Sequence, residues 1–416
     1  MTSELTRREF LKTGAVMGAA AVVSPAYAGL DERIPVQGQQ QPKIKEYRIL
    51  GRTGMKISDI SLGAAYTRDP AVIDYILNCG VNYIDAAERY SNGQIETLVG
   101  QIAKTRRKDF FLTTKLALRS TDTEEGLIDR FNKCLERLQT NYVDVLMAHD
   151  SRSIELMMLP AFHNAYKKLK ADGKARFLGI SEHDTTMAEV CNYAIEDGRF
   201  DVILLVYNFM QEKAADILKN AAKKNVGTVI MKALAASHPV QVRNITREQR
   251  QEMQTETTRR IEQFQKEYSL TQEEFPGAAV RWILQNKDVS TIILSMRSFD
   301  TANQYIAASG GAFTKKDADV LNRYSMANNS TYCRHSCGVC QPYCPYGVAV
   351  NDILRMESYF ANYHEEKIAI QRYAVIDNSP KPLPCSTCPG YCERRCPYGL
   401  SVKERLINAH EMLTLG

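Results

Sequence analysis

Four polar side chains of different chemistry lie at the ends of three successive apolar runs. Asp85 and Tyr90 belong to VNYIDAAERY, Lys115 lies in DFFLTTKL, and His149 lies in YVDVLMAHD. If these runs are parallel strands of a barrel, their carboxyl ends meet on one face. A nearby ammonium favours phenolate, so we expect Lys115 to lower the pKa of Tyr90 toward neutrality. The pattern predicts a proton-transfer site.

A second set of reactive residues lies near the C-terminus, where eight of the eleven cysteines fall between positions 333 and 396. They form two groups of four, and both groups end in Cys-Pro-Tyr-Gly, which indicates an internal duplication. Iron–sulfur clusters, zinc and disulfides are all open for such a set. The eight are Cys333, Cys337, Cys340, Cys344, Cys385, Cys388, Cys392 and Cys396.

The elements that must position the four polar side chains alternate in type. Between residues 46 and 326, eight short apolar runs alternate with helical patterns such as EEGLIDRFNKCLERL, for which Asp122 is the expected N-cap. This alternation predicts an α/β fold, a (β/α)8 TIM barrel. A doubly wound sheet is the alternative, and the lack of Gly-x-Gly-x-x-Gly after the first strand argues against it.

Composition and the N-terminal segment bear on location. The 53 basic and 48 acidic residues give a net charge of +5 without a basic block, which argues against nucleic-acid binding. The first residues contain an Arg-Arg pair, an apolar run too short for a stable membrane span, and an Ala-Tyr-Ala triplet ending at Ala28. TRREFLK resembles the twin-arginine (Tat) export motif. We expect a Tat signal peptide over 1–28, a linker over 29–45 and a periplasmic mature protein.

The region from Glu46 to about Ala307 resembles the aldo-keto reductase family. The resemblance rests on EYRILGRTGMKISDISLGAAY, GVNYIDAAERYSNGQIETLVGQ, FFLTTKL, DVLMAHD and FLGIS. It implies interconversion of carbonyl and alcohol groups on a small substrate or sugar. It also implies four catalytic residues. Tyr90 is the expected acid or base, supported by Asp85, Lys115 and His149.

The same resemblance implies NADP(H), held tightly because free nucleotide is not expected outside the cytoplasm. The residues that it implies for binding are Ser181, Tyr207, Asn208, Arg297 and Gln304. Glu182 stands where the family has asparagine, and a carboxylate cannot donate to the nicotinamide carbonyl. A nucleotide-independent redox enzyme and a non-catalytic, disulfide-stapled barrel that binds a sugar or a partner are the alternatives.

Residues 327–416 resemble the helical two-cluster ferredoxin domain fused to some aldo-keto reductases. In two-cluster ferredoxins the fourth cysteine of each group ligates the other cluster. The resemblance therefore implies two [4Fe–4S] clusters that relay electrons to or from a redox partner, although each group has one residue more than the usual spacing. The implied ligand sets are Cys333, Cys337, Cys340 and Cys396 for one cluster, and Cys385, Cys388, Cys392 and Cys344 for the other.

Overall fold

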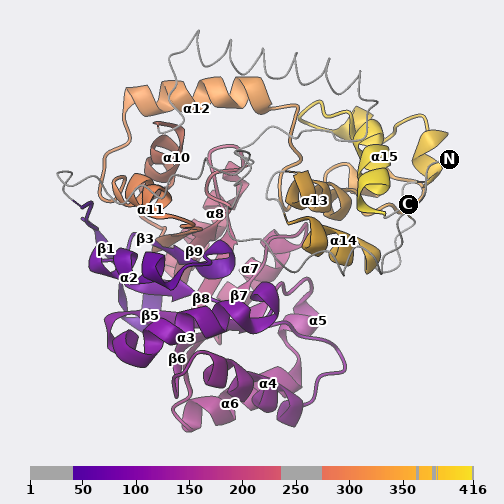
Figure 1. Ribbon diagram of the computed structural model, residues 1–416. Coiled ribbons are helices and arrows are strands. Elements are labelled where there is room, and N and C mark those ends of the chain that lie inside the picture. The colour runs from indigo at the N-terminus through magenta and orange to yellow at the C-terminus, as the bar shows by residue number, and fades with distance from the viewer. Residues whose placement is uncertain (1–40, 236–273, 362–364, 377–380, 382, 415–416) are drawn as a thin grey trace, which may run out of the picture. The chain divides into compact units, whose positions relative to one another are not determined.

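The computed structural model describes residues 41–235, 274–361, 365–376, 381 and 383–414 (Figure 1). The expected signal peptide and residues 29–40 of the expected linker lie outside this range. Within the described residues, no helix is both long enough and apolar enough to cross a membrane.

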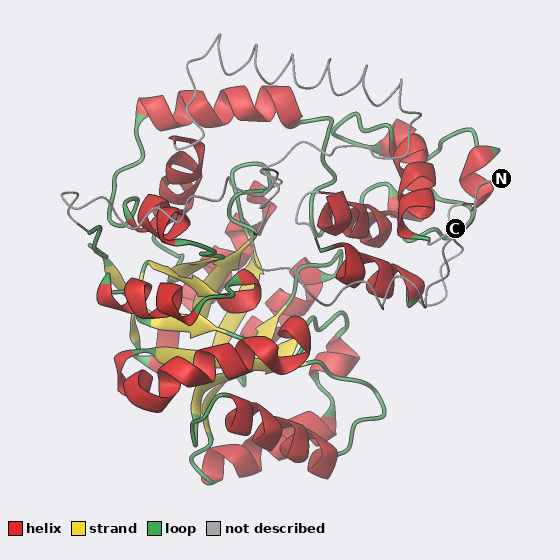
Figure 2. Ribbon diagram, viewed as in Figure 1, coloured by secondary structure: helices red, strands yellow, loops and turns green. Residues whose placement is uncertain are grey.

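Eight parallel strands close into a barrel, which confirms the predicted (β/α)8 architecture (Figure 2). The strands are hydrogen-bonded in the order β10-β3-β4-β5-β6-β7-β8-β9, and β10 closes the ring by pairing with β3. Each apolar run identified in the sequence contains one of these strands. Their bounds are β3 Ile60–Gly63, β4 Tyr83–Asp85, β5 Phe111–Leu116, β6 Val143–His149, β7 Ala175–Ser181, β8 Val202–Val206, β9 Gly227–Met231 and β10 Thr291–Leu294.

The helices that follow the strands bury one face each against the barrel. In α4 the buried residues Leu127, Phe131 and Cys134 recur at helical spacing, as an amphipathic helix requires. The helices are α2 Pro70–Asn78, α3 Gln94–Arg106, α4 Glu124–Arg137, α5 Ile154–Met157, α6 Pro160–Ala171, α7 Met187–Asp197, α8 Ala215–Lys223, α10 Glu274–Leu284 and α11 Phe299–Ile306.

The N-cap predicted for α4 is wrong by one residue. Thr123, not Asp122, takes the extended backbone of an N-cap, and its side chain accepts from the backbone N–H of Gly126. Asp122 instead accepts hydrogen bonds from the backbone N–H of Arg119 (2.9 Å) and the guanidinium of Arg130 (3.0 Å).

An antiparallel hairpin that the sequence patterns did not predict precedes the barrel. It consists of β1 Tyr47–Ile49 and β2 Lys56–Ser58. The connection packs fully buried Leu50 against side chains that fill the barrel interior. A Cβ on Gly51, whose φ is +49°, would lie 2.2 Å from the backbone nitrogen of Gly227. Glycine at position 51 therefore lets the hairpin approach the start of β9.

The C-terminal segment has its own hydrophobic core. After α12, Lys315–Asn328, the helices are α13 Val350–Ala361, α14 Glu366–Ala374 and α15 Val402–Leu413. Helices α13 and α15 follow the two Cys-Pro-Tyr-Gly sequences and pack against each other. Buried side chains such as Leu354 and Leu406 share this core with Cys340, Cys385 and Cys392. The two halves of the duplication thus form one packed unit.

Asp144 in β6 provides a test of how the strands are held together. Its carboxylate, 1% exposed, accepts from Arg107 (2.8 Å), Arg176 (2.9 Å) and the backbone N–H of Leu112 (2.8 Å). Asp144→Ala removes the anion and leaves these donors without their acceptor. We expect it to lower the free energy of unfolding by about 3 kcal/mol, measured by denaturant titration.

The matched control is Asp172→Ala, at an exposed carboxylate after α6. We expect this substitution to change the free energy of unfolding by less than about 0.5 kcal/mol. Equal unfolding midpoints for the two variants would contradict a structural role for Asp144.

Candidate active site

The structure brings together the four polar side chains singled out in the sequence. The Lys115 ammonium lies 2.5 Å from Asp85 Oδ1, 2.8 Å from the Ala86 carbonyl oxygen and 3.1 Å from the Tyr90 hydroxyl. The His149 ring packs edge-on against Tyr90, with 5.7 Å between ring centroids. Asp85 and Lys115 are fully buried, and His149 is 8% exposed. Phenol, ammonium, carboxylate and imidazole therefore form one contiguous set.

The backbone shortly after β4 and directly after β6 is bent into uncommon conformations. Ser91 and Asn92, directly after Tyr90, have φ angles of +48° and +53°, and Asp150, directly after His149, has φ +57°. Non-glycine residues in this left-handed region concentrate at functional sites, because surrounding contacts must hold them there. Glu88 supplies one such contact by accepting from the backbone N–H of Ala117 at 2.8 Å. This bond ties the loop that carries Tyr90 to the chain leaving β5.

The expectation that Lys115 lowers the pKa of Tyr90 is wrong. Burial and the negative charge of Asp85 raise the pKa of Tyr90 well above its ordinary value. Burial also lowers the pKa of Lys115 and raises that of Asp85, and each partner's charge opposes the other's shift. At neutral pH the Tyr90 hydroxyl is therefore protonated and available as a donor.

His149 is held as a neutral imidazole. Burial, followed by the positive charge of Lys115, lowers the pKa of His149 well below its ordinary value. Its Nδ1 has no hydrogen-bond partner among the described residues. A neutral imidazole has one N–H, which can donate to a substrate oxygen.

A cavity of about 420 Å³ opens at the carboxyl ends of the strands. Asp85, Tyr90 and His149 line one part of it. Other lining residues come from the C-terminal segment: Tyr359 of α13, and Glu365, Ile368 and Arg372 at or in α14. The sequence patterns did not predict this contribution, because nothing near these positions marks them as part of a barrel site.

The residues implied to bind a nucleotide are placed unevenly. Ser181 and Arg297 line the cavity, whereas Tyr207, Asn208 and Gln304 are not among its lining residues. The Tyr207 ring packs against Trp282, with 5.0 Å between centroids. The fully buried Asn208 amide donates to the Lys232 carbonyl oxygen at 3.0 Å and accepts from the backbone N–H of Met210 at 3.0 Å. Tyr207 and Asn208 therefore support the cavity wall from behind.

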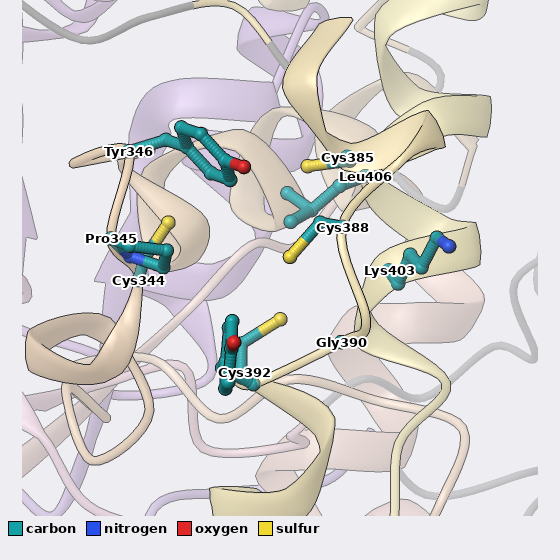
Figure 3. Close-up of a pocket in the computed structure, with 10 residues that line it drawn as sticks. Cys344, Pro345, Tyr346, Cys385, Cys388, Gly390, Cys392, Lys403 and Leu406 are labelled. Carbon is teal, nitrogen blue, oxygen red and sulfur yellow. The ribbon is translucent and has the colours of Figure 1, made fainter.

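Four of the eight C-terminal cysteines line one small pocket, and their sulfur atoms point into the same space (Figure 3). The pocket combines three cysteines of the second group with the last cysteine of the first. The four are Cys385, Cys388, Cys392 and Cys344. This is the combination that the ferredoxin resemblance implied for one cluster.

The remaining cysteines also lie near one another. Burial, together with the neighbouring Cys337 and Cys340, raises the pKa of Cys333 to about 12. Burial, together with the neighbouring Cys392, Cys337 and Cys396, likewise raises the pKa of Cys340 to about 12. Cys396 of the second group is thus an electrostatic neighbour of the first group. All eleven cysteines are free thiols in the structure.

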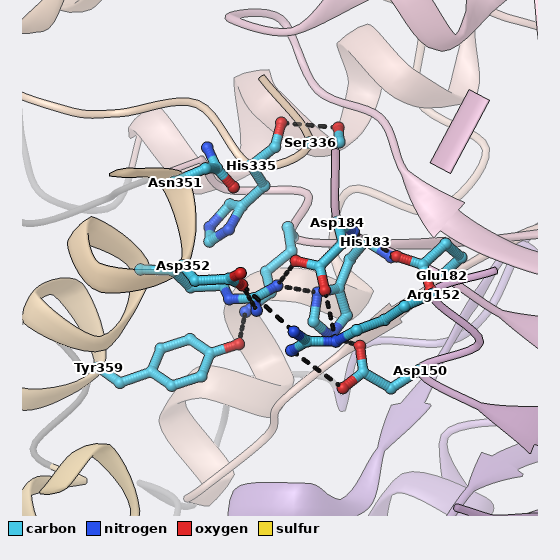
Figure 4. Close-up of polar contacts among 12 residues, drawn as sticks. Asp150, Arg152, Glu182, His183, Asp184, His335, Ser336, Asn351, Asp352 and Tyr359 are labelled. Carbon is cyan, nitrogen blue, oxygen red and sulfur yellow. Dashed lines mark hydrogen bonds and ion pairs between the residues drawn. The ribbon is translucent and has the colours of Figure 1, made fainter. Parts of the chain in front are cut away.

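A network of charges, buried around Asp184 and Arg355 and exposed at Arg152, joins the barrel to α13, and we call it the bridging cluster (Figure 4). Arg355 contacts the Asp184 carboxylate and lies 2.7 Å from His183 Nδ1 and 2.6 Å from Asp352 Oδ1. Arg152 lies 2.7 Å from Asp184 Oδ2. The members of the bridging cluster are Asp150, Arg152, Glu182, His183, Asp184, Asp352 and Arg355.

Carboxylate oxygens of three members of the bridging cluster lie within 4.8 Å of one another, a spacing that a cation could bridge. Here Arg152 and Arg355 already supply positive charge to Asp184, and Arg152 also lies 3.6 Å from Asp150. The cluster is therefore a network of ion pairs between barrel and helix. The three carboxylates are Asp150, Glu182 and Asp184.

Glu182 does not face the catalytic cavity. Its Oε1 accepts from the backbone N–H groups of His183 (2.8 Å) and Asp184, and its Oε2 has no hydrogen-bond partner among the described residues. Burial, with Asp150 and Asp184 nearby, raises the pKa of Glu182 to about 8. The Glu182 side chain, at the position where the family has asparagine, thus lies in the bridging cluster and does not line the cavity.

A closed barrel with acid–base side chains at its strand ends has the architecture of a TIM-barrel enzyme. Residues 60–325 match the family model described as Aldo/keto reductase family, and the chain belongs to that family of oxidoreductases. Residues 4–24 match the model of the twin-arginine translocation pathway signal sequence, which confirms the predicted export signal.

Individual relatives are distant. The uncharacterized oxidoreductase YqkF of Bacillus subtilis is 32% identical over 148 residues, which cover 32% of this chain and 48% of that protein. The chain thus spans about half the length of this relative. NADH-specific methylglyoxal reductase of Escherichia coli is 24% identical over 317 residues, covering 67% of this chain and 95% of that protein.

Among solved structures, the holo form of an aldo-keto reductase from Bacillus halodurans has the same fold. Its TM-score is 0.52 and its sequence identity is 20%, and the match covers 67% of this chain and 95% of that chain.

The raised pKa of Glu182 predicts a pH-dependent stability. Its folded-state pKa of about 8 lies above the unfolded value, so the folded state holds a proton that the unfolded state releases. Stability is therefore lost as pH rises between about 4.3 and about 8. We expect Glu182→Gln to be more stable than wild type at pH 8.5 by roughly 2–4 kcal/mol, and nearly equal to it at pH 4.5. Denaturant titrations at both pH values measure this difference, and a gap that does not grow with pH would contradict it.

Proposed function

We propose that this exported aldo/keto reductase interconverts carbonyl and alcohol groups, with Tyr90 as the proton donor and acceptor. The observation that carries the proposal is the contact of Lys115 with both the Tyr90 hydroxyl (3.1 Å) and Asp85 (2.5 Å) beside His149. The similarity to methylglyoxal reductase, which is named for reducing a small carbonyl compound, agrees with this chemistry.

In the reducing direction a substrate carbonyl oxygen lies against Tyr90 and His149. His149, neutral because its pKa is depressed, donates its N–H to the oxygen as negative charge develops there. Tyr90 then gives its proton to that oxygen. Lys115, charged and held by Asp85, stabilises the phenolate that remains. In the oxidising direction the same phenolate accepts the alcohol proton.

The hydride carrier that we propose is NADP(H): NADPH would supply a hydride to the substrate carbonyl carbon in reduction, and NADP⁺ would accept a hydride from the alcohol carbon in oxidation. Ser181 and Arg297 fit such a group, because both line the catalytic cavity. The Arg297 guanidinium also lies over the Tyr66 ring at 4.8 Å. We propose that Ser181 binds the nicotinamide amide and that Arg297 binds a nucleotide phosphate.

A nucleotide-independent redox reaction is the second candidate. It is favoured by the placement of Tyr207 and Asn208, which lie outside the cavity lining. Mass spectrometry of small molecules released by denaturing the purified protein separates the two candidates. Stoichiometric NADP supports the first candidate, and its absence together with undiminished activity supports the second.

We further propose that the eight C-terminal cysteines hold two [4Fe–4S] clusters, which would supply one-electron transfer to or from a redox partner. Two features support the proposal: four sulfur atoms point into one pocket, and all eight cysteines are free thiols. The Tat signal fits this proposal, because that route carries folded proteins and so permits cluster insertion before export to the periplasm.

Tyr90→Phe tests the proposed acid. Removing the hydroxyl removes the proton donor but keeps the ring, so we expect kcat/KM for carbonyl reduction to fall about 10²–10⁴-fold. Steady-state kinetics on an aldehyde panel that includes methylglyoxal measures the loss. Tyr193→Phe, at a tyrosine of α7 that is 41% exposed, is the matched control and should retain wild-type rates. Unchanged turnover by Tyr90→Phe would refute the assignment.

Cys388→Ser tests the cluster proposal. Anaerobically purified wild-type protein is expected to contain about eight iron atoms and to absorb near 400 nm. Cys388→Ser removes a ligand from one site only, so we expect iron content to fall by about half. Cys191→Ser, at a buried cysteine of the barrel, is the control and should leave iron content unchanged. Wild-type protein without iron would overturn the proposal.

A further inference from the structure

The wall of the catalytic cavity carries more positive charge than its carboxylates balance. Among the described residues, the only carboxylates that line the cavity are Asp85 and Glu365. Asp85 is bound to Lys115, and Glu365 pairs with Arg68 at 4.0 Å. Against these stand five cationic side chains in the lining: Arg68, Arg89, Lys232, Arg297 and Arg372.

Four of the five cations have a partner in the cavity wall; one of them, Arg372, lies over the Tyr359 ring, with 5.8 Å from its guanidinium carbon to the ring centre. Besides the ion pair of Arg68, the Lys232 ammonium donates to the Tyr359 hydroxyl at 3.0 Å and lies 4.5 Å from the centre of its ring. Arg297 lies over the ring of Tyr66. Neither Arg89 nor Arg372 has a carboxylate within ion-pair distance in the described part of the chain. These two arginines hold the excess charge.

Arg89 and Arg372 are close enough to repel each other. Burial lowers the pKa of Arg89, the negative charge of Asp150 raises it, and the positive charge of Arg372 lowers it again. A guanidinium does not lose its proton in a protein, so both arginines stay charged, and a bound anion would relieve the repulsion between them. Arginine binds carboxylates through two parallel N–H donors, which makes it well suited to such a group.

The unbalanced charge lies beside the reacting groups. Arg89 directly precedes Tyr90 in the chain. Arg372 belongs to α14, and its positive charge opposes the rise in the pKa of Tyr90 and adds to the lowering of the pKa of His149. A negative group bound between the two arginines would therefore lie near the substrate oxygen that Tyr90 and His149 serve.

We propose that the substrates are hydroxy acids and oxo acids, whose carboxylate binds between Arg89 and Arg372. This inference rests on the proposed function, and it names the substrate class of the same cavity. The C-terminal segment then selects the substrate, because it supplies one of the two arginines. Neutral aldehydes and sugars fit the catalytic set but leave the charge of the two arginines unmatched.

The test compares matched acids and neutral analogues by isothermal titration calorimetry on the full-length protein. The pairs are D-galacturonate with D-galactose, D-glucuronate with D-glucose, and pyruvate with methyl pyruvate. We expect at least one acid to bind about tenfold or more tightly than its neutral partner. Arg372→Gln should abolish that preference and Arg372→Lys should retain part of it. Lys367→Gln, at an exposed position of the same helix, should leave it intact.

Two results would overturn the inference. One is an acid preference that is absent in wild type or survives in Arg372→Gln. The other is that Arg372→Gln weakens binding of NADP⁺ but not of the acids, which would assign the charge to nucleotide phosphates. Because binding is measured without turnover, these results are independent of the Tyr90→Phe kinetics, and each proposal can fail alone.

Discussion

A lysine charge enclosed in the barrel is the constraint on which the candidate active site depends. Lys115 is fully buried, and an ammonium without water is stable only when acceptors surround it. Its three acceptors are the Asp85 carboxylate, the Ala86 carbonyl and the Tyr90 hydroxyl, all from β4 or the loop that follows. The need to satisfy one cation therefore fixes the path of this loop and the position of the phenol. The left-handed backbone at Ser91 and Asn92 is the conformational cost of that path.

A second buried cation sets the relation between barrel and C-terminal segment. Arg355 of α13 is 3% exposed, and its partners Asp184 and His183 come from the loop after β7. This contact brings Tyr359, one turn further along α13, into the cavity wall. The bridging cluster and the catalytic cavity thus share one helix. A change in how the C-terminal segment packs would be felt at the substrate-binding wall.

The barrel and the four polar side chains could be predicted from the sequence because local patterns indicate both. Apolar runs predict strands, and the carboxyl ends of parallel strands lie on one face, so Lys115 and His149 could be placed together in advance. The direction of the pKa shift of Tyr90 could not be predicted, because it depends on burial and on the nearby charge of Asp85. Whether the Tyr207 side chain lines the cavity or lies outside it is likewise decided by tertiary packing, here against Trp282. Arg372 carries no local signal at all, since only tertiary folding brings α14 to the barrel.

The crossed arrangement of the cysteines has a consequence for biosynthesis. Cys344 lies with Cys385, Cys388 and Cys392, and Cys396 neighbours Cys340. Under the proposed assignment of these cysteines to two clusters, neither ligand set is complete until the ribosome has translated nearly the whole chain. Metal insertion would then follow translation, after the barrel sequence has been made. It would link cysteines that lie far apart in the sequence. An exported protein that holds both clusters would therefore contain the chain at least as far as Cys396.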